Sequence, residues 1–223
     1  MPISANGYRG EFDSAPAIRR LGRVDMRAFD VVIAGAILLF IAPLLLALAM
    51  FVVAQDGGPP LFAQVRLGRD GRVFKCLKFR TMVRNAEERL NAVLLTDPQA
   101  RAEWNTTRKL RNDPRITSIG RFLRKSSLDE LPQLINVIRG EMSLVGPRPI
   151  VQAEADRYGW RFRHYSSVRP GITGLWQVSG RSDVSYRCRV ALDSLYVQNQ
   201  SPRLYMAILL RTVPAVLMRS GSY

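Results

Sequence analysis

The sequence has little histidine and little cysteine: His164 stands alone, and Cys76 and Cys188 are the two cysteines among 223 residues. Two cysteines cannot form a disulfide framework, and one histidine excludes a His-rich metal cluster. A Ser-His-Asp hydrolase would have to use His164, and no G-x-S-x-G motif surrounds any serine. These absences exclude a disulfide-stapled domain and a histidine-based metal site, and they argue against a serine hydrolase.

Acidic residues are also scarce: 18 Asp and Glu stand against 33 Lys and Arg, which gives a net charge of +15. Residues 1–56 hold five arginines and five acids, so the whole excess lies in residues 57–223. A body this basic favours polyanionic partners, namely nucleic acid, anionic lipid or phosphorylated substrates. Since 47% of the residues are hydrophobic, the chain can bury a sizeable core and is not disordered.

A long apolar run extends from Val31 to Ala54, 24 residues without a charge. As a helix it would be about 36 Å long, enough to cross a hydrocarbon core of roughly 30 Å. A core helix of a soluble protein would carry a polar stripe, and this segment has none. A signal peptide has a shorter apolar region and a shorter preceding segment. We therefore predict a membrane helix over residues 29–56, after an N-terminal tail of residues 1–28.

Basic residues flank this run on both sides. Four arginines from Arg19 to Arg27 precede it, and six basic residues from Arg66 to Arg80 follow it. The positive-inside rule would keep both flanks in the cytoplasm, which a straight span cannot satisfy. Pro43 lies in the middle of the run, where it removes a helical hydrogen bond. Two topologies stay open from the residues alone: a kinked ordinary span, and a re-entrant helix broken at Pro43 that returns to the same face.

The sequence pattern of residues 57–223 predicts a mainly α-helical domain with a small β-hairpin (α+β). The hairpin strands are Leu61–Leu67 and Arg72–Lys78, around a turn at Asp70-Gly71. Helices are expected over residues 84–111, with a break near Asp97-Pro98, and over 116–124, 128–139, 184–198 and 203–219. The last of these is mostly apolar with spaced basic residues, which is typical of an interfacial amphipathic helix or a core-packed one.

Two adjacent carboxylates, Asp129 and Glu130, stand at the head of an apolar segment just after Arg124. One interpretation is structural, because Ser127 and Glu130 have the spacing of a helix capping box. Pro132 disfavours that register and places Asp129 at the mouth of the helix, where a phosphate group also binds. Adjacent acids can then take different roles, one as a nucleophile and one as a ligand of a hard cation such as Mg²⁺.

Basic residues recur in patterns that fit a phosphate partner or a plain solvated surface. Lys78 and Arg80 alternate and so share one face of a strand. Pro147-Arg148-Pro149 holds one arginine between two prolines, which restrict where its guanidinium points. Residues 157–165 interleave arginines with aromatic residues, as in single-strand nucleic-acid platforms or membrane-interface belts. The apolar run favours the belt.

Four stretches together resemble the bacterial sugar transferases, the monotopic phosphoglycosyl transferases that begin exopolysaccharide or O-antigen synthesis on a polyprenyl phosphate. They are DVVIAGAILLFIAPLLLALA, LGRDGRVFKCLKFRTM, RFLRKSSLDELPQLINVIRGEMSLVGPRP and RPGITGLWQVSGRSDVSYRCRVALDSLYVQNQ. They cover most of residues 29–223 in order. Within the family, the chain is similar to the short exopolysaccharide-initiating members and to undecaprenyl-phosphate galactose phosphotransferases.

This resemblance implies a re-entrant, non-spanning helix with the catalytic domain, residues 57–223, on the cytoplasmic face of the bacterial inner membrane. Family members carry Ser-Pro at the helix break, whereas this chain has Ala42-Pro43. The implied reaction transfers a sugar-1-phosphate, of galactose or glucose, from a UDP-sugar to undecaprenyl phosphate and releases UMP. The family's Asp-Glu pair falls on Asp129 and Glu130. Asp129 would attack the β-phosphate and carry the phosphosugar, and Glu130 would be a metal ligand or acid/base partner.

The resemblance also assigns binding residues. The family's Pro-Arg-Pro element, associated with the nucleotide, falls on Pro147, Arg148 and Pro149. Basic positions of the family motifs that are expected to hold phosphates fall on Lys78, Arg80 and Arg124. Mg²⁺ is the implied cofactor, with Asp129 and Glu130 as its ligands, and the implied partners are a UDP-sugar, undecaprenyl phosphate and anionic membrane lipid.

Two other functions stay open at this point. The basic composition allows a membrane-anchored nucleic-acid-binding protein, although no recognised nucleic-acid motif supports it and no nucleic-acid partner is expected. A non-catalytic membrane scaffold for polysaccharide assembly is the other alternative.

Overall fold

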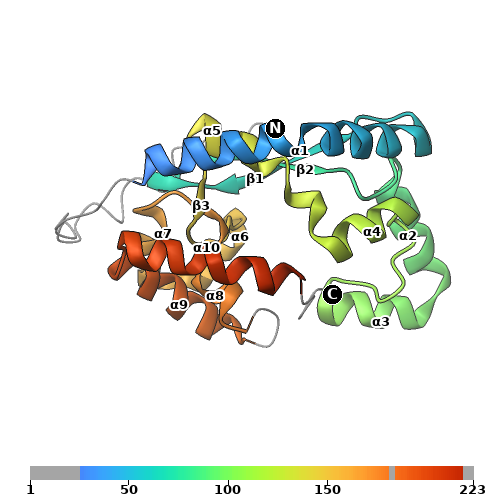
Figure 1. Cartoon of the computed structure of the whole chain (residues 1–223). Helices are drawn as coiled ribbons and strands as arrows, with labels where there is room; N and C mark the ends of the chain where they lie inside the picture. The colour runs from blue at the N-terminus through green and yellow to red at the C-terminus, as the bar shows by residue number, and fades with distance from the viewer. Residues whose placement is uncertain (1–25, 181–183, 218–223) are drawn as a thin grey trace.

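The computed structural model describes residues 26–180 and 184–217 (Figure 1). Most of the predicted N-terminal tail, residues 1–28, therefore lies outside the described residues. In chain order the elements are α1 (Arg27–Asp56), β1 (Leu61–Leu67), η1 (Arg69–Gly71), β2 (Val73–Phe79), α2 (Ala86–Thr96), α3 (Pro98–Thr107), α4 (Ser118–Ser126), η2 (Leu128–Glu130), α5 (Gln133–Arg139), β3 (Ser143–Val145), α6 (Gln152–Tyr158), η3 (Gly159–Arg161), α7 (Phe162–Ser166), β4 (Gly171–Thr173), α8 (Leu175–Val178), α9 (Tyr186–Gln198) and α10 (Pro202–Leu217). The mainly helical fold with little strand confirms the predicted class.

The predicted hairpin is present. Strands β1 and β2 pair antiparallel from Leu61↔Phe79 to Leu67↔Val73, and η1 joins them with Asp70 and Gly71 in the left-handed region. The predicted helical break also forms, since the Asp97 side chain accepts hydrogen bonds from the first amides of α3 and Pro98 occupies the first helical turn.

A second small sheet was not predicted. Strands β3 and β4 pair in parallel, Ser143 with Gly171 and Val145 with Thr173. Three-residue strands are too short to show alternation, and the sequence around them is rich in turn residues. The two segments approach so closely that a Cβ on Gly171 would lie 2.0 Å from the amide nitrogen of Gly146. Glycine is required at this contact because any side chain would collide with backbone.

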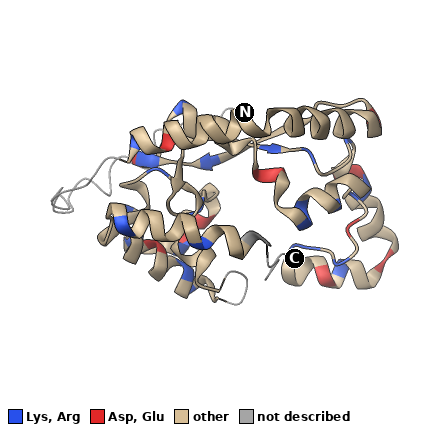
Figure 2. Ribbon diagram, viewed as in Figure 1, with Lys and Arg blue, Asp and Glu red and all other residues tan. Residues whose placement is uncertain are grey.

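The apolar run forms one 30-residue helix, α1, which continues through Pro43. It lies along one edge of the molecule (Figure 1), and Figure 2 shows it free of charge between its two ends. Its outer face is strongly exposed, with Leu39 at 81% and Phe40 at 86%. The structure thus confirms a helix long and apolar enough for a membrane. A re-entrant path broken at Pro43 stays a prediction.

The N-terminal half of α1 is fixed by a buried carboxylate. Oδ1 of Asp30, a residue only 2% exposed, accepts hydrogen bonds from the Leu144 amide at 2.8 Å, the Ser143 hydroxyl at 3.0 Å and the Tyr205 hydroxyl at 2.6 Å. One turn later, Ala34 is fully buried in the largest core cluster. These contacts join α1 to β3 and α10.

The C-terminal half of α1 is fixed by a different part of the body. Leu48 and Val52 pack against Phe79 of β2 and Leu123 of α4. The guanidinium of Arg80 donates two hydrogen bonds to Asp56, the last residue of the helix, at 2.8 and 2.5 Å. Both ends of α1 are therefore attached to the same body.

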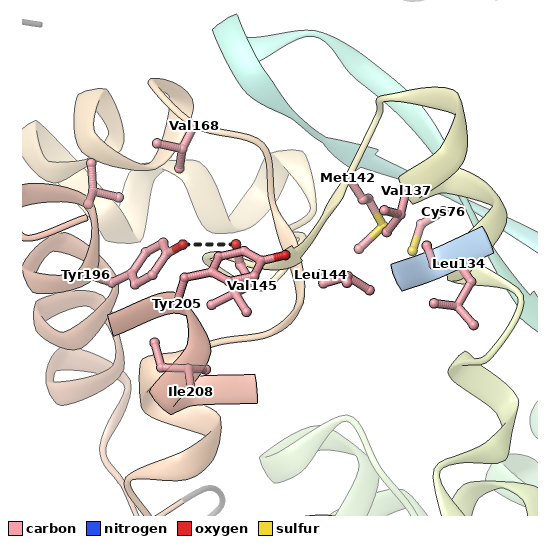
Figure 3. Close-up of a cluster of buried hydrophobic side chains, with 12 residues drawn as sticks. Cys76, Leu134, Val137, Met142, Leu144, Val145, Val168, Tyr196, Tyr205 and Ile208 are labelled. Atoms are coloured by element: carbon pink, nitrogen blue, oxygen red, sulfur yellow. Dashed lines mark hydrogen bonds between the residues drawn. The ribbon is translucent and has the colours of Figure 1, made fainter. Parts of the chain in front are cut away.

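Helix α10 buries one face and exposes the other. Tyr205 and Ile208 belong to the main core, which also contains Tyr196, whose hydroxyl donates to the carbonyl of Val145 at 3.1 Å (Figure 3). Leu210 and Val213 are exposed on the opposite face. Of the two interpretations of this segment, core packing is confirmed for one face, and the apolar outer face remains available to a membrane surface.

Two aromatic residues of the predicted interfacial belt, residues 157–165, instead contribute to the core. Tyr158 and Tyr165 are buried together in a second cluster. Trp160 is exposed, and the guanidinium groups of Arg161 and Arg163 lie over its ring at 4.7 and 5.2 Å from its centroid. The run is therefore divided between core and surface.

The Asp30 contacts predict a graded loss of stability. Tyr205→Phe removes one donor and should lower the free energy of unfolding by about 1 kcal/mol. Asp30→Asn keeps an oxygen acceptor but replaces the carboxylate with a weaker neutral one and buries an amide NH₂ group, and it should cost about 2–4 kcal/mol. Denaturant unfolding of the purified protein measures both. Asp70→Asn, an exposed side chain on η1, is the control; a similar loss there would contradict the anchoring role of Asp30.

Candidate active site

A cleft of about 1500 Å³ opens between the β1–β2 and α4 side of the molecule and the α8–α10 side. It is lined by an acidic pair, by basic side chains from several segments that are distant along the chain, and by aliphatic residues. The acidic turn η2 lies in the middle of the molecule, below α1 (Figure 2). All six charged residues predicted for the site line this one cleft: Lys78, Arg80, Arg124, Asp129, Glu130 and Arg148.

The backbone around the acidic pair differs from the predicted helix. Ser127 adopts a left-handed conformation, φ 58°, and its amide caps the end of α4, so it cannot act as the N-cap of a capping box. The next residues form the tight turn η2, and α5 begins only at Gln133. The prediction that Asp129 lies at the mouth of a helix over residues 128–139 is thus wrong. Pro132 instead occupies the N-cap position directly before α5, where its missing amide hydrogen costs no helical hydrogen bond.

Glu130 is held by two cations. Its Oε1 lies 2.6 Å from Lys78 Nζ and 3.7 Å from a guanidinium nitrogen of Arg148. Burial alone would raise the pKa of Glu130, but Lys78 and Arg148 outweigh it and hold the pKa below the usual value. Glu130 is therefore ionised at neutral pH.

Asp129, one residue earlier, experiences the opposite effect. Burial, followed by the negative charge of Glu130, raises the pKa of Asp129 to about 6, against the attraction of Lys78 and Arg124. The adjacent carboxylates thus differ in chemical character although they share one turn. A carboxylate of raised pKa that still ionises at neutral pH is more nucleophilic than an ordinary aspartate.

The Pro147-Arg148-Pro149 loop follows directly from the unpredicted parallel sheet. Both prolines are buried, the Gly171 amide donates to the carbonyl of Pro147 at 2.8 Å, and Arg66 donates to the carbonyl of Pro149 at 3.3 Å. The Arg148 side chain is left partly exposed and reaches Glu130. The prediction that the prolines direct this arginine toward a ligand cleft agrees with that geometry.

The three basic residues that were expected to hold phosphates, Lys78, Arg80 and Arg124, have different partners. Lys78, on β2, pairs with Glu130. Arg124, on α4, donates from Nε to the Thr81 hydroxyl at 2.8 Å. Arg80 follows the end of β2 and is occupied by Asp56, so in this structure it anchors α1 as well as lining the cleft. The predicted common face of Lys78 and Arg80 thus serves two different carboxylates.

A second charged group in the cleft wall was not predicted. Glu154 lies 3.7 Å from Arg66 and 4.0 Å from Arg189, and the Arg189 guanidinium stands over the Trp176 ring at 4.9 Å from its centroid. These residues come from β1, α6, α8 and α9. No local sequence signal joins them, because each is an ordinary helix or strand residue whose neighbours in the cleft are distant along the chain.

The acidic pair can be compared with what a divalent metal requires. Among residues 26–180 and 184–217 there is no group of three or more His, Cys, Asp or Glu side chains that could hold a metal ion. Mg²⁺ needs only one or two carboxylates when substrate phosphates and water supply the other oxygens. Asp129 and Glu130 fit that requirement, and they do not fit a metal that needs an all-protein cage.

Comparison with known proteins identifies the family. The model of the bacterial sugar transferases matches residues 21–219. The chain belongs to the bacterial sugar transferase family. The predicted resemblance is confirmed, and with it the expectation of a transferase.

Three relatives show how similar this chain is to known proteins and how much of their length it covers. It is 58% identical over 197 residues to the "UDP-galactose-lipid carrier transferase" of Erwinia amylovora, covering 88% of this chain and 41% of that protein. It is 52% identical to the "Undecaprenyl-phosphate galactose phosphotransferase" of Salmonella typhimurium, covering 92% of this chain and 43% of that protein. It is 51% identical to the "Exopolysaccharide production protein ExoY" of Sinorhizobium fredii, covering 93% and 92%. The chain thus spans less than half of the first two.

The opposite pKa shifts of the pair predict opposite effects on stability. The pKa of Asp129 is higher in the folded state, so its ionisation destabilises the fold progressively as pH rises from about 4 to 6. Asp129→Asn should therefore raise the free energy of unfolding at pH 7 by about 2 kcal/mol, with no gain below pH 4. Glu130→Gln removes an ionised group of lowered pKa and should destabilise at pH 7, less so in acid. Thermal unfolding across this pH range measures both; changes of the same sign at pH 7 would contradict the assignment.

Proposed function

We propose that this transferase moves a sugar-1-phosphate from a UDP-sugar to undecaprenyl phosphate, through a covalent aspartyl-phosphosugar, and releases UMP. The observation that carries the proposal is the acidic pair: Asp129 and Glu130 are adjacent, have opposite pKa shifts and face a cleft lined with basic residues. Galactose is the favoured sugar because two relatives above 50% identity are named for it.

In the first step, an Asp129 carboxylate oxygen attacks the β-phosphorus of the UDP-sugar. The bond between that phosphorus and the oxygen bridging to UMP breaks, so UMP leaves with the electron pair and the phosphosugar stays on Asp129. A carboxylate nucleophile needs no general base once it is ionised, which agrees with a chain containing one histidine. A pKa of about 6 leaves most of Asp129 ionised at pH 7.

In the second step, a phosphate oxygen of undecaprenyl phosphate attacks the same phosphorus. The acyl phosphate bond to Asp129 breaks, which regenerates the carboxylate and gives undecaprenyl diphosphate sugar. Both substrates are anionic, so the site must offset charge as the two phosphates meet. Arg124, Arg148 and Lys78 are the cations nearest to the pair that could do so.

Mg²⁺ would be held by Asp129 and Glu130, and when bound it would neutralise part of the diphosphate charge. Lys78 and Arg148 keep Glu130 ionised and oriented, since both contact its Oε1. Arg148, held by the rigid Pro147-Arg148-Pro149 loop, is suited to a bidentate contact with a nucleotide phosphate.

We further propose that α1 enters the cytoplasmic leaflet of the inner membrane without crossing it. A 30-residue helix is about 45 Å long, and a straight crossing would carry one end away from the body. Both ends of α1 instead contact this body, through Asp30 and Asp56. The +15 charge would then hold the protein against anionic headgroups.

Labelling tests the topology. In a Cys188→Ser background, single cysteines replacing Ala5 and Pro60 should both react with a membrane-impermeant maleimide only from the cytoplasmic side of oriented vesicles. Cys76 is buried and serves as an internal control for leakage or unfolding. Labelling of the two positions from opposite sides would establish an ordinary span.

Activity tests the role of Asp129. Purified protein with Mg²⁺, UDP-galactose and undecaprenyl phosphate should release UMP, and Asp129→Asn should lose at least about 10³-fold, together with the trapped phosphosugar. Because Asp129 must be ionised, kcat/KM should fall tenfold per pH unit below about pH 6. Glu141→Gln, outside the cleft, is the control. UMP release by Asp129→Asn at the parent rate would overturn its role as nucleophile.

A further inference from the structure

The loop that carries Arg148 is held on both sides of that residue. On one side, the Gly171 amide donates to the carbonyl of Pro147 at 2.8 Å. On the other side, Ile150 pairs antiparallel with Leu67 at the end of strand β1, and the Leu67 amide donates to the carbonyl of Ile150 at 2.9 Å. The path of the backbone through Arg148 therefore depends on contacts with segments that are distant along the chain.

The hydroxyl of Tyr165 completes this pairing. In a hydrogen-bonded antiparallel pair, each residue donates its amide hydrogen to the carbonyl of the other. Between Leu67 and Ile150 one such bond is direct, and the hydroxyl joins the other two groups, because it accepts from the Ile150 amide at 3.2 Å and donates to the Leu67 carbonyl at 2.6 Å. Tyr165 belongs to α7 and lies 98 positions after Leu67. A side chain from a distant helix thus takes part in the backbone pairing.

We propose that Tyr165 is a positioning residue, which fixes Arg148 for the reaction by holding the backbone two residues after it. The inference rests on the proposed function, which gives Arg148 a role at Glu130 and at a nucleotide phosphate. Tyr165 is only 2% exposed, so it acts through the loop and not by touching a substrate. The Arg148 guanidinium lies 3.7 Å from Glu130 Oε1, and a displacement of the loop changes that distance. Reactions in preorganised sites are sensitive to displacements of this kind.

Burial makes the hydroxyl important to the loop. Tyr165 packs in the second core cluster, where its ring centroid lies 5.4 Å from that of Tyr158 and 5.8 Å from that of Phe162. Leu67 and Ile150 are buried in the same cluster. Loss of the hydroxyl leaves a buried amide and a buried carbonyl without this partner, which costs more free energy than a hydrogen bond contributes. The pairing then opens more often, and the loop loses one of its attachments.

Tyr158 offers a matched control. It is buried in the same cluster as Tyr165, and its hydroxyl also donates a hydrogen bond, to Asp193 Oδ2 on α9 at 2.8 Å. Tyr158→Phe therefore removes the same group from the same core, but from a partner outside the Arg148 loop. Both tyrosine variants should lower the stability of the fold, so an effect of general destabilisation would be seen in both.

Release of UMP from UDP-galactose, with undecaprenyl phosphate as acceptor, tests the effect on the reaction. Tyr165→Phe should lower kcat/KM about tenfold, and Tyr158→Phe should stay within about twofold of the parent. The loss should vanish in an Arg148→Ala background, measured with enzyme in excess, because Tyr165 acts through that side chain. Equal losses in the two tyrosine variants, or an undiminished loss in the Arg148→Ala background, would overturn the positioning role.

Amide hydrogen exchange needs no substrate, so it separates this inference from the proposed function. In the parent, the Ile150 and Leu67 amides should exchange at similar rates, because both are released when the pairing opens. The Ile150 amide should exchange at least about tenfold faster in Tyr165→Phe and at the parent rate in Tyr158→Phe. This pattern without UMP release from the parent would support the hold of Tyr165 on the loop and contradict only the proposed function. Exchange of Ile150 far faster than that of Leu67 in the parent would overturn the inference, even if Tyr165→Phe does not fold.

Discussion

A buried carboxylate must be fully hydrogen-bonded, and the placement of α1 depends on this constraint. Asp30 accepts three hydrogen bonds at one oxygen, from β3 and α10, so α1 cannot rotate or slide without breaking hydrogen bonds to a buried carboxylate. At the other end Asp56 receives two bonds from Arg80. Between these polar anchors the helix has no charge. The apolar helix is therefore attached to the body near both ends, while its outer face between the two acidic residues is exposed.

The anchors attach α1 to two different sides of the cleft. Its N-terminal half packs with α10 and β3, and its C-terminal half packs with β2 and α4. The acidic turn η2 lies between these sides, next to α4. Helix α1, which would meet the membrane, therefore connects the two sides of the cleft. A water-soluble sugar nucleotide and a membrane-bound phosphate could meet there without the lipid head leaving the interface.

The proposed chemistry depends on the different electrostatic environments of two neighbouring carboxylates. Lys78 and Arg148 compensate Glu130 directly, while Asp129 receives weaker compensation and the charge of Glu130 beside it. Desolvation acts on both groups, so the difference comes from which cations reach which oxygen. The left-handed Ser127 and the short turn after it direct the two side chains differently. An α-helical register, as predicted from Pro132, would have given a different arrangement.

The sequence by itself determined the family, the long apolar helix, the hairpin, the break at Asp97-Pro98 and the identity of the charged residues at the site, because each depends on local pattern or on a contiguous motif. Only the tertiary structure decided that Arg80 holds the end of α1, that β3 and β4 pair, that Asp129 precedes α5 on a separate turn, and that Glu154 and Arg189 share the cleft wall. Those features join residues that are distant along the chain, and the contact between Asp30 and Tyr205 spans 175 positions. Long-range contacts and the desolvation they cause leave no periodicity in the chain, so they become visible only when the core has assembled around them.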